Sequence, residues 1–134
     1  MMRFTLPYPP SVNNYWKKWR NRIVISQAGV TYRELINQTL WYRVRKDGMW
    51  DGEPMFGDLA VEIVIYPPDK RKRDMDNIKK ALFDALEHAR LFYDDYQICC
   101  DYTIRSDEVI KDGAIDFKIY RIDKNVLFAK ILTI

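Results

Sequence analysis

Cysteine and histidine are scarce in this 134-residue sequence, which contains two cysteines and one histidine. Cys99 and Cys100 are neighbours, so a disulfide between them would close a strained ring, and as adjacent strand residues they would face opposite ways. Together with His88 they supply too few ligands for a structural zinc site. We therefore expect two reduced, structural cysteines and no zinc.

Long apolar runs are also missing, since no stretch approaches the roughly 20 residues needed to span a bilayer. The segment 1–8 carries one basic residue, and prolines interrupt the apolar residues here, so it does not resemble the core of a secretory signal. These absences predict a cytoplasmic protein without membrane association.

The overall composition is that of one compact domain. The chain is 48% hydrophobic, and at this length it should bury roughly two-thirds of the surface that its unfolded form exposes. We therefore expect a single domain over residues 1–134, in which 123–134 form a C-terminal extension of unknown role. The net charge of +3 is unevenly distributed, because residues 1–50 contain 9 basic and 2 acidic side chains and the remainder contains 13 and 17. This asymmetry requires a functional explanation.

The N-terminal half is expected to form two short strands and a helix. Residues 3–6 and 22–26 read as strands, separated by a proline-rich segment that favours extended and turn conformations. Ser26 can cap a helix whose apolar residues recur at helical spacing and which should end near Asp47 and Gly48.

The C-terminal half alternates strands with a second helix. Leu59–Tyr66 has the period-2 pattern of a strand, and the helix that follows has an apolar stripe and can be capped by Asp74 or Asp76. Residues 98–104 and 115–122 read as two further strands, which we expect to form a hairpin.

This interleaved order predicts an α+β fold, with a single mixed β-sheet and helices packed on one face. The segment 123–134 is apolar for a terminus, so we expect it to pack on the body or on a partner chain.

Four consecutive cations precede an Asp-x-Asp pair at the junction between the 59–66 strand and the second helix. Hard divalent ions such as Mg²⁺ bind carboxylate oxygens, waters and substrate phosphate oxygens, so Asp74 and Asp76 are candidate metal ligands. Lys80 lies one turn further along the helix, where its ammonium group could contact a scissile phosphate.

Each of these features also has a purely structural interpretation. Asp74 and Asp76 suit the first turn of a helix whether or not they bind metal, and Asp76 with Lys80 is an ordinary i,i+4 ion pair. A run of cations is usually a solvated loop, and Asp94 with Asp95 is by itself a turn signal.

The functional interpretation gains weight because all these features fall within the 27 residues from Asp69 to Asp95. A loop after the helix could return beside the strand end that the chain left, and Asp95 would then supply a third carboxylate. Three such acids could complete a metal site that cleaves phosphodiesters.

The segment from Asp69 to Gln97 includes Asp-Met-Asp-Asn and Tyr-Asp-Asp-Tyr-Gln, and residues 6–16 are Leu-Pro-Tyr-Pro-Pro-Ser-Val-Asn-Asn-Tyr-Trp. These two segments resemble the RusA family of Holliday junction resolvases. The resemblance implies a homodimeric, Mg²⁺-dependent endonuclease, often prophage-encoded, that nicks four-way DNA junctions in recombination and repair, with Mn²⁺ as an alternative metal. The sequence departs from the family pattern at Arg90, where the family commonly has glycine.

The resemblance also implies site residues. The catalytic acids and metal ligands would be Asp74, Asp76 and Asp95, and the essential lysine would be Lys80. Symmetric nicks in a junction are most simply made by a C2 dimer, whose interface could come from the C-terminal segment or the helix at 28–46.

Cations and aromatic side chains alternate in the segment after the prolines, as expected where phosphates are neutralised and exposed bases stack. The alternative is that the aromatic rings anchor the segment on the core. The predicted DNA-binding residues are Asn13, Asn14, Tyr15, Trp16, Lys17, Lys18, Arg20, Arg22, Lys70, Arg71, Lys72 and Arg73.

Two competing functions use the same residues differently. A non-catalytic junction or single-stranded DNA-binding module would use the carboxylates only as helix caps. An enzyme acting on a metal-bound nucleotide is disfavoured, because the sequence has no glycine-rich phosphate loop.

Overall fold

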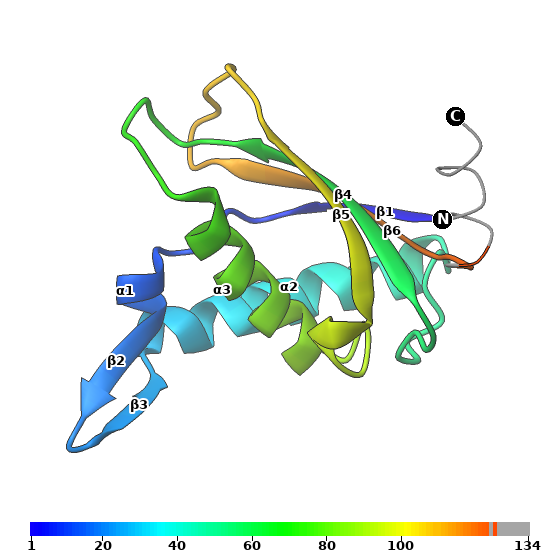
Figure 1. The fold of residues 1–134 in the computed structure, drawn as a ribbon, viewed down its shortest axis with the longest axis horizontal. Coiled ribbons are helices and arrows are strands. Elements are labelled where there is room, and N and C mark those ends of the chain that lie inside the picture. The colour runs from blue at the N-terminus through cyan, green and yellow to red at the C-terminus, as the bar shows by residue number, and fades with distance from the viewer. Residues whose placement is uncertain (124, 126–134) are drawn as a thin grey trace.

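The structure, a computed structural model, describes residues 1–123 and residue 125, and it is built on a four-stranded mixed sheet (Figure 1). The elements in chain order are β1 (Met2–Leu6), α1 (Val12–Tyr15), β2 (Trp16–Trp19), β3 (Arg22–Ile25), α2 (Gln27–Lys46), β4 (Leu59–Tyr66), α3 (Met75–His88), the 3₁₀ turn η1 (Asp95–Gln97), β5 (Ile98–Arg105) and β6 (Ala114–Arg121).

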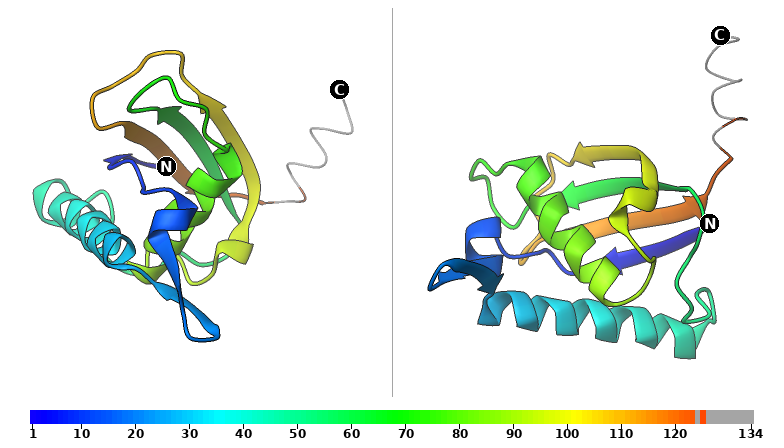
Figure 2. Two further views of the ribbon diagram at one scale, coloured as in Figure 1. Left: turned by 90° about the vertical axis from the view of Figure 1, so that its left-hand side faces the viewer. Right: turned by 60° about the horizontal axis from the view of Figure 1, so that its bottom comes forward.

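The sheet order is β1-β6-β4-β5, and only β4 and β5 run parallel. The chain passes from β4 through α3 to β5, the crossover connection that parallel strands require. A separate two-stranded sheet, β2-β3, projects from the body as a hairpin (Figures 1 and 2). The α+β fold predicted from the sequence is confirmed.

The predicted hairpin between the last two strands is wrong, because β6 pairs with β1 and β4 rather than with β5. The polar connection crosses the end of the sheet instead of turning back on itself. It is held there by backbone hydrogen bonds from Ser106 N to Ile65 O (2.8 Å) and from Ile110 N to Pro67 O (3.1 Å). Since β5 already occupies one edge of β4, β6 takes the other edge and becomes an interior strand.

Helices α2 and α3 cover one face of the sheet, as predicted (Figure 2). The apolar stripe of α3, which includes Ile78, Leu82 and Leu86, is buried in one core cluster with Val61 and Ile63 of β4. This packing fixes where both ends of α3 lie relative to the sheet.

The helix caps follow the sequence closely. Ser26 caps α2, and its Oγ accepts from Gly29 N at 3.0 Å. Of the two candidates for α3, Asp74 is the cap, and its Oδ1 accepts from Asp76 N at 2.9 Å. None of the described helices is long and apolar enough to cross a membrane. The prediction that the segment 123–134 packs on the body or on a partner falls almost entirely outside the described residues.

Candidate active site and nucleic-acid interface

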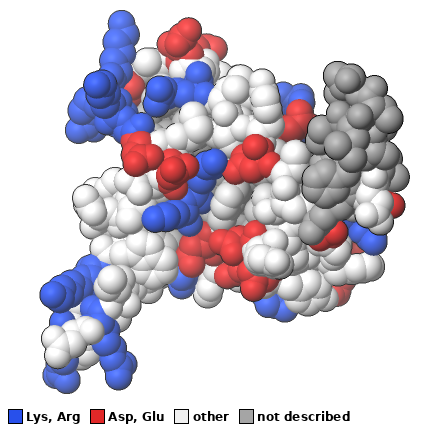
Figure 3. Space-filling model, in the orientation of Figure 1, with Lys and Arg blue, Asp and Glu red and all other residues white. Residues whose placement is uncertain are grey.

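Charged side chains gather in several patches on the face that Figure 3 shows. Lys and Arg side chains gather over the β2-β3 hairpin and over the loop between β4 and α3, with acidic groups between and beside them. Predicted site residues come from each of these regions, so we describe them in turn.

Two predicted acids lie at the N-terminal end of α3. Asp74 is the N-cap, while the Asp76 side chain is 82% exposed and free to face a ligand. The predicted ion pair between Asp76 and Lys80 does not form. Instead Lys79 Nζ lies 3.9 Å from Asp76 and 3.0 Å from Asp101 on β5. Lys80, one position on, is exposed and has no such pairing, as its proposed role requires.

The basic loop before α3 is ordered by Asp69. Arg73 donates to both carboxylate oxygens of Asp69, at 2.7 and 2.9 Å, and Arg71 Nη2 lies 3.1 Å from the same group. These hydrogen bonds hold the pKa of Asp69 well below its ordinary value, and those from Arg73 have the largest effect. The Arg73 side chain is only 21% exposed, and its contact with Asp69 stabilises the conformation of the loop. Lys70 and Lys72, in contrast, are exposed to solvent.

Two adjoining clefts connect this loop to the hairpin. One, of about 210 Å³, lies between residues 8–13 and the start of α3, and its lining includes Arg73 and Asp74. The other, of about 550 Å³, lies between the hairpin and α3, and its lining includes Lys80. Val12 and Asn13 line both clefts, so the cleft that Asp74 lines adjoins the cleft that Lys80 lines.

A further group of carboxylates lies at the C-terminal end of α3, with Glu87 in the last turn of the helix and Asp94 and Asp95 after it. Glu87, Asp94 and Asp95 each offer an oxygen within 4.8 Å of the others, and Glu87 Oε1 accepts from Asp95 N at 2.9 Å. Burial, followed by the hydrogen bond and charge of Asp94, raises the pKa of Asp95. Clustered carboxylate oxygens are the donors that hard divalent cations prefer, so this set fits such an ion.

The prediction from the sequence included Asp94 and Asp95 but not Glu87. The signal was present, since Glu87 lies seven positions after Lys80 and therefore on the same face of α3.

Within one chain, Asp95 is not brought to Asp74 and Asp76. The 14 residues of α3 separate them, a rise of about 21 Å along the helix axis. The prediction that the loop after α3 returns beside the end of β4 is therefore wrong. Because β5 starts beside the start of β4, as the pairing of Leu59 with Ile98 shows, the chain must reach the opposite end of the sheet before β5 begins.

The turn after α3 contains the one departure from the family pattern. Arg90 adopts a left-handed conformation with φ of 65°, a region that glycine enters without strain. Its guanidinium lies over the Tyr93 ring at 5.3 Å. The arginine thus adopts the left-handed conformation that glycine favours.

Tyr15 has a structural position rather than a DNA-facing one. Its side chain is fully buried, and its hydroxyl donates to Oδ2 of Asp84 on α3. Burial raises the pKa of Tyr15 far above its ordinary value, and the hydrogen bond to Asp84 is the second largest cause. The ring has no surface on which a base could stack, so we do not retain Tyr15 among the DNA-binding residues. Trp16 is partly buried against the core, so the alternative of anchoring applies to it in part.

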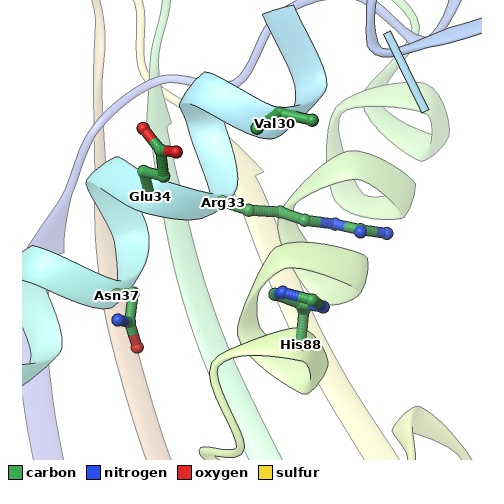
Figure 4. A pocket seen from close by; sticks show the side chains of 5 residues that line it. All are labelled: Val30, Arg33, Glu34, Asn37 and His88. Atoms are coloured by element: carbon green, nitrogen blue, oxygen red, sulfur yellow. The ribbon is translucent and has the colours of Figure 1, made fainter. Parts of the chain in front are cut away.

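Arg33 on α2 donates hydrogen bonds to the Tyr15 hydroxyl and to the carboxylate of Asp84. It also borders a cleft of about 450 Å³ between α2 and α3, together with His88 (Figure 4). No residue predicted from the sequence lines this cleft, and its neighbours Glu34 and Asn37 belong to α2. We assign it no role in the reaction.

The hairpin carries the remaining predicted cations. Lys17, Lys18, Arg20 and Arg22 are all exposed, as predicted. Asn13 and Asn14, at the base of the hairpin, are exposed as well.

An α+β domain that combines exposed cations with carboxylate groups able to hold a metal ion has the features of a nucleic-acid-processing protein. The family model described as "Endodeoxyribonuclease RusA" matches residues 7–119, so the chain belongs to the RusA family.

Relatives that share this family name are similar over most of their length. The crossover junction endodeoxyribonuclease RusA of Shigella sonnei (strain Ss046) is 39% identical over 116 residues, which are 86% of this chain and 90% of that protein. The proteins of the same name from Escherichia coli (strain K12) and Enterobacteria phage 82 are 38% and 39% identical over the same shares.

Proposed function

We propose that this protein is a Holliday junction resolvase, an endodeoxyribonuclease that resolves four-way DNA junctions by paired symmetric nicks in recombination and repair. The observation that carries the proposal is the family match over residues 7–119, which spans the proposed catalytic residues Asp74, Asp76, Lys80 and Asp95. The phage relative fits a prophage origin, and action on DNA inside the cell fits a cytoplasmic location.

The proposed metal is Mg²⁺, with Mn²⁺ as an alternative. Asp74, Asp76 and Asp95 would hold it, since carboxylate oxygens suit a hard cation and Asp76 is exposed. When bound, the metal activates water and stabilises the leaving oxygen of a phosphodiester. Lys80 would contact the scissile phosphate from the cleft that adjoins the one lined by Asp74.

The separation of the acids along α3 supports a homodimer. If the proposed triad acts as one site, a second copy must supply the missing acid, so that Asp74 and Asp76 of one chain meet the partner's Asp95. A two-fold axis would generate two identical composite sites, one for each strand to be cut. The dimer would then be a requirement for metal binding as well as for symmetric cleavage.

The DNA-binding surface would consist of the exposed cations and their neighbours. These neutralise phosphates with little base readout. The retained residues are Asn13, Asn14, Trp16, Lys17, Lys18, Arg20, Arg22, Lys70, Arg71, Lys72 and Arg73.

A non-catalytic junction-binding module is the second candidate. It is favoured by two observations: Asp74 caps α3, and one chain does not bring Asp74, Asp76 and Asp95 together. This candidate predicts binding without metal-dependent cleavage.

Incubation with a synthetic four-way junction and a matched linear duplex, with and without Mg²⁺, separates the two candidates. We expect paired nicks in the junction alone, only with metal, and their loss in Asp76→Asn with binding retained. Glu108→Gln, a neutralised exposed acid outside α3, is the matched control and should cleave normally. Undiminished cleavage by Asp76→Asn would refute the assignment of the acids.

A further inference from the structure

The β2-β3 hairpin is a projecting arm whose tip is a tight turn. Trp19 pairs with Arg22 across the two-residue turn formed by Arg20 and Asn21, and Arg20 has a φ of 56°. The arm extends away from α2 and α3 in all three views (Figures 1 and 2). Residues 18–23, which form its outer half, are all exposed.

Two large apolar side chains stand on this outer half. Trp19 is 52% exposed and Ile23 is 77% exposed. In the register, Ile23 lies opposite Lys18 and Trp19 opposite Arg22, so the two apolar groups are interleaved with cations. Exposed apolar groups among cations are expected where a protein contacts both bases and phosphates, and a wholly phosphate-binding arm would not need them.

One face of the arm is directed to the proposed catalytic region. Ile23, Trp16 and Lys18 line the same cleft of about 550 Å³ as Lys80 of α3. DNA held at Lys80 would thus run directly along the arm.

The base of the arm is fixed to the body. Ser26 Oγ donates to the carbonyl oxygens of both Asn14 and Tyr15, and Ser26 N donates to Tyr15 O at 2.9 Å. A Cβ on Gly29 would lie 2.5 Å from Tyr15 O, so only glycine permits this approach of α2. The buried Tyr15 is tied to Asp84, so the arm is held at a set angle.

We propose that the arm is a wedge that enters the open centre of a four-way junction, where Trp19 and Ile23 stack against the bases that border the branch point. This inference rests on the proposed function and deepens it, because it supplies the basis for selecting junctions over linear duplexes. In a duplex every base is stacked on both sides, and insertion must disrupt that stacking. At a branch point the stacking is already interrupted, so the same insertion costs less there.

The test is binding without divalent metal, so that it does not depend on cleavage. For the variant Trp19→Ala with Ile23→Ala, we expect affinity for a synthetic four-way junction to fall about ten-fold, because each stacked base contributes strongly. Affinity for a linear duplex should change by less than about two-fold, since the cations remain. Wild-type protein should also raise the permanganate reactivity of thymines at the branch point, and the variant should not.

Two further variants make the result specific. Phe56→Ala is the matched control, because Phe56 is 60% exposed with Arg121 beside its ring, much as Trp19 lies beside Arg20. It should bind both substrates normally. Trp19→Phe keeps a stacking ring and should keep junction preference, which separates loss of stacking from a misfolded arm.

A double variant with the wild-type junction-to-duplex ratio and the wild-type permanganate pattern would overturn the wedge. So would a wild-type protein that leaves thymine reactivity at the branch point unchanged. Neither result would bear on the proposed function, which fails only if the wild-type protein does not nick junctions with metal.

Discussion

Arg33 on α2 donates from both Nε and Nη2 to one oxygen, Oδ2 of Asp84 on α3, at 3.1 and 2.9 Å. The Tyr15 hydroxyl donates to the same oxygen, so α1, α2 and α3 meet at a single carboxylate. Both charged side chains are mostly buried, with exposed fractions of 21% and 26%. This cluster fixes the base of the hairpin arm relative to Lys80.

Replacement of Arg33 by Met should lower the free energy of unfolding by about 1–2 kcal/mol, because a partly buried carboxylate loses its charged donor. Urea unfolding followed by circular dichroism measures this. Glu34→Gln, at an exposed residue of the same helix, is the control and should change the free energy of unfolding by less than about 0.5 kcal/mol. Equal effects of both substitutions would contradict a special role for the cluster.

The cluster illustrates what the sequence could and could not predict. Helix and strand positions followed from local patterns, so Leu59–Tyr66 and the Asp74 cap were anticipated. Tyr15 was misjudged because the segment around it reads as a uniform aromatic-basic stretch, and nothing local reveals that it reaches Asp84, 69 positions away. Pairings between distant residues carry no local signal.

The same limit explains the error about Asp95. The spacing of the motifs correctly joined both acidic groups to one helix, but the parallel pairing of β4 with β5, which places them at opposite ends, is a long-range property. Sequence patterns located the proposed catalytic side chains individually, and the fold determined which of them can act together in one chain.

A composite site predicts that two inactive variants restore each other. Asp76→Asn and Asp95→Asn should each abolish cleavage alone. In a mixed dimer, one composite site carries both substitutions and the other carries neither, so mixing should restore single nicks. Measuring nicked and fully resolved junction products in the mixture tests this.

Two mixtures serve as controls for the composite site. Asp74→Asn mixed with Asp76→Asn places one substitution in each site and should stay inactive. If each chain uses its own three acids, the mixture of Asp76→Asn with Asp95→Asn will be as inactive as this control, and the composite site will be rejected.

Asp95→Asn should stabilise the metal-free protein, raising Tm by about 1–2 °C at pH 7. Burial and Asp94 raise the pKa of Asp95, so the folded state disfavours the ionised carboxylate. A carboxyl group whose pKa is raised by folding contributes stability at pH values below its pKa in the unfolded chain. This stability is lost as the pH rises through the pKa of the group in the folded protein. The gain in Asp95→Asn should therefore fade towards pH 3.5, below the ordinary pKa of aspartate.

Thermal melts from pH 3.5 to 8, with and without Mg²⁺, measure both effects. Mg²⁺ should raise the Tm of the wild-type protein, since a ligand that binds only the folded state stabilises it, and this rise should be smaller in Asp95→Asn. Asp107→Asn, in the exposed connection after β5, is the control and should respond to Mg²⁺ like the wild type. An identical response in Asp95→Asn would remove this residue from the proposed ligands.

The hairpin cations should contribute to affinity through counterion release. For Lys17→Ala with Lys18→Ala, the slope of log affinity against log salt concentration should become shallower by about 2, because each phosphate contact contributes a little under one unit. Junction and duplex should weaken together, unlike in the wedge variant, since phosphates carry no structural preference. Titrations at several salt concentrations measure the slope. Lys46→Ala, at the far end of α2, should leave it unchanged, and a similar change there would mean that the arm has no particular contact with DNA.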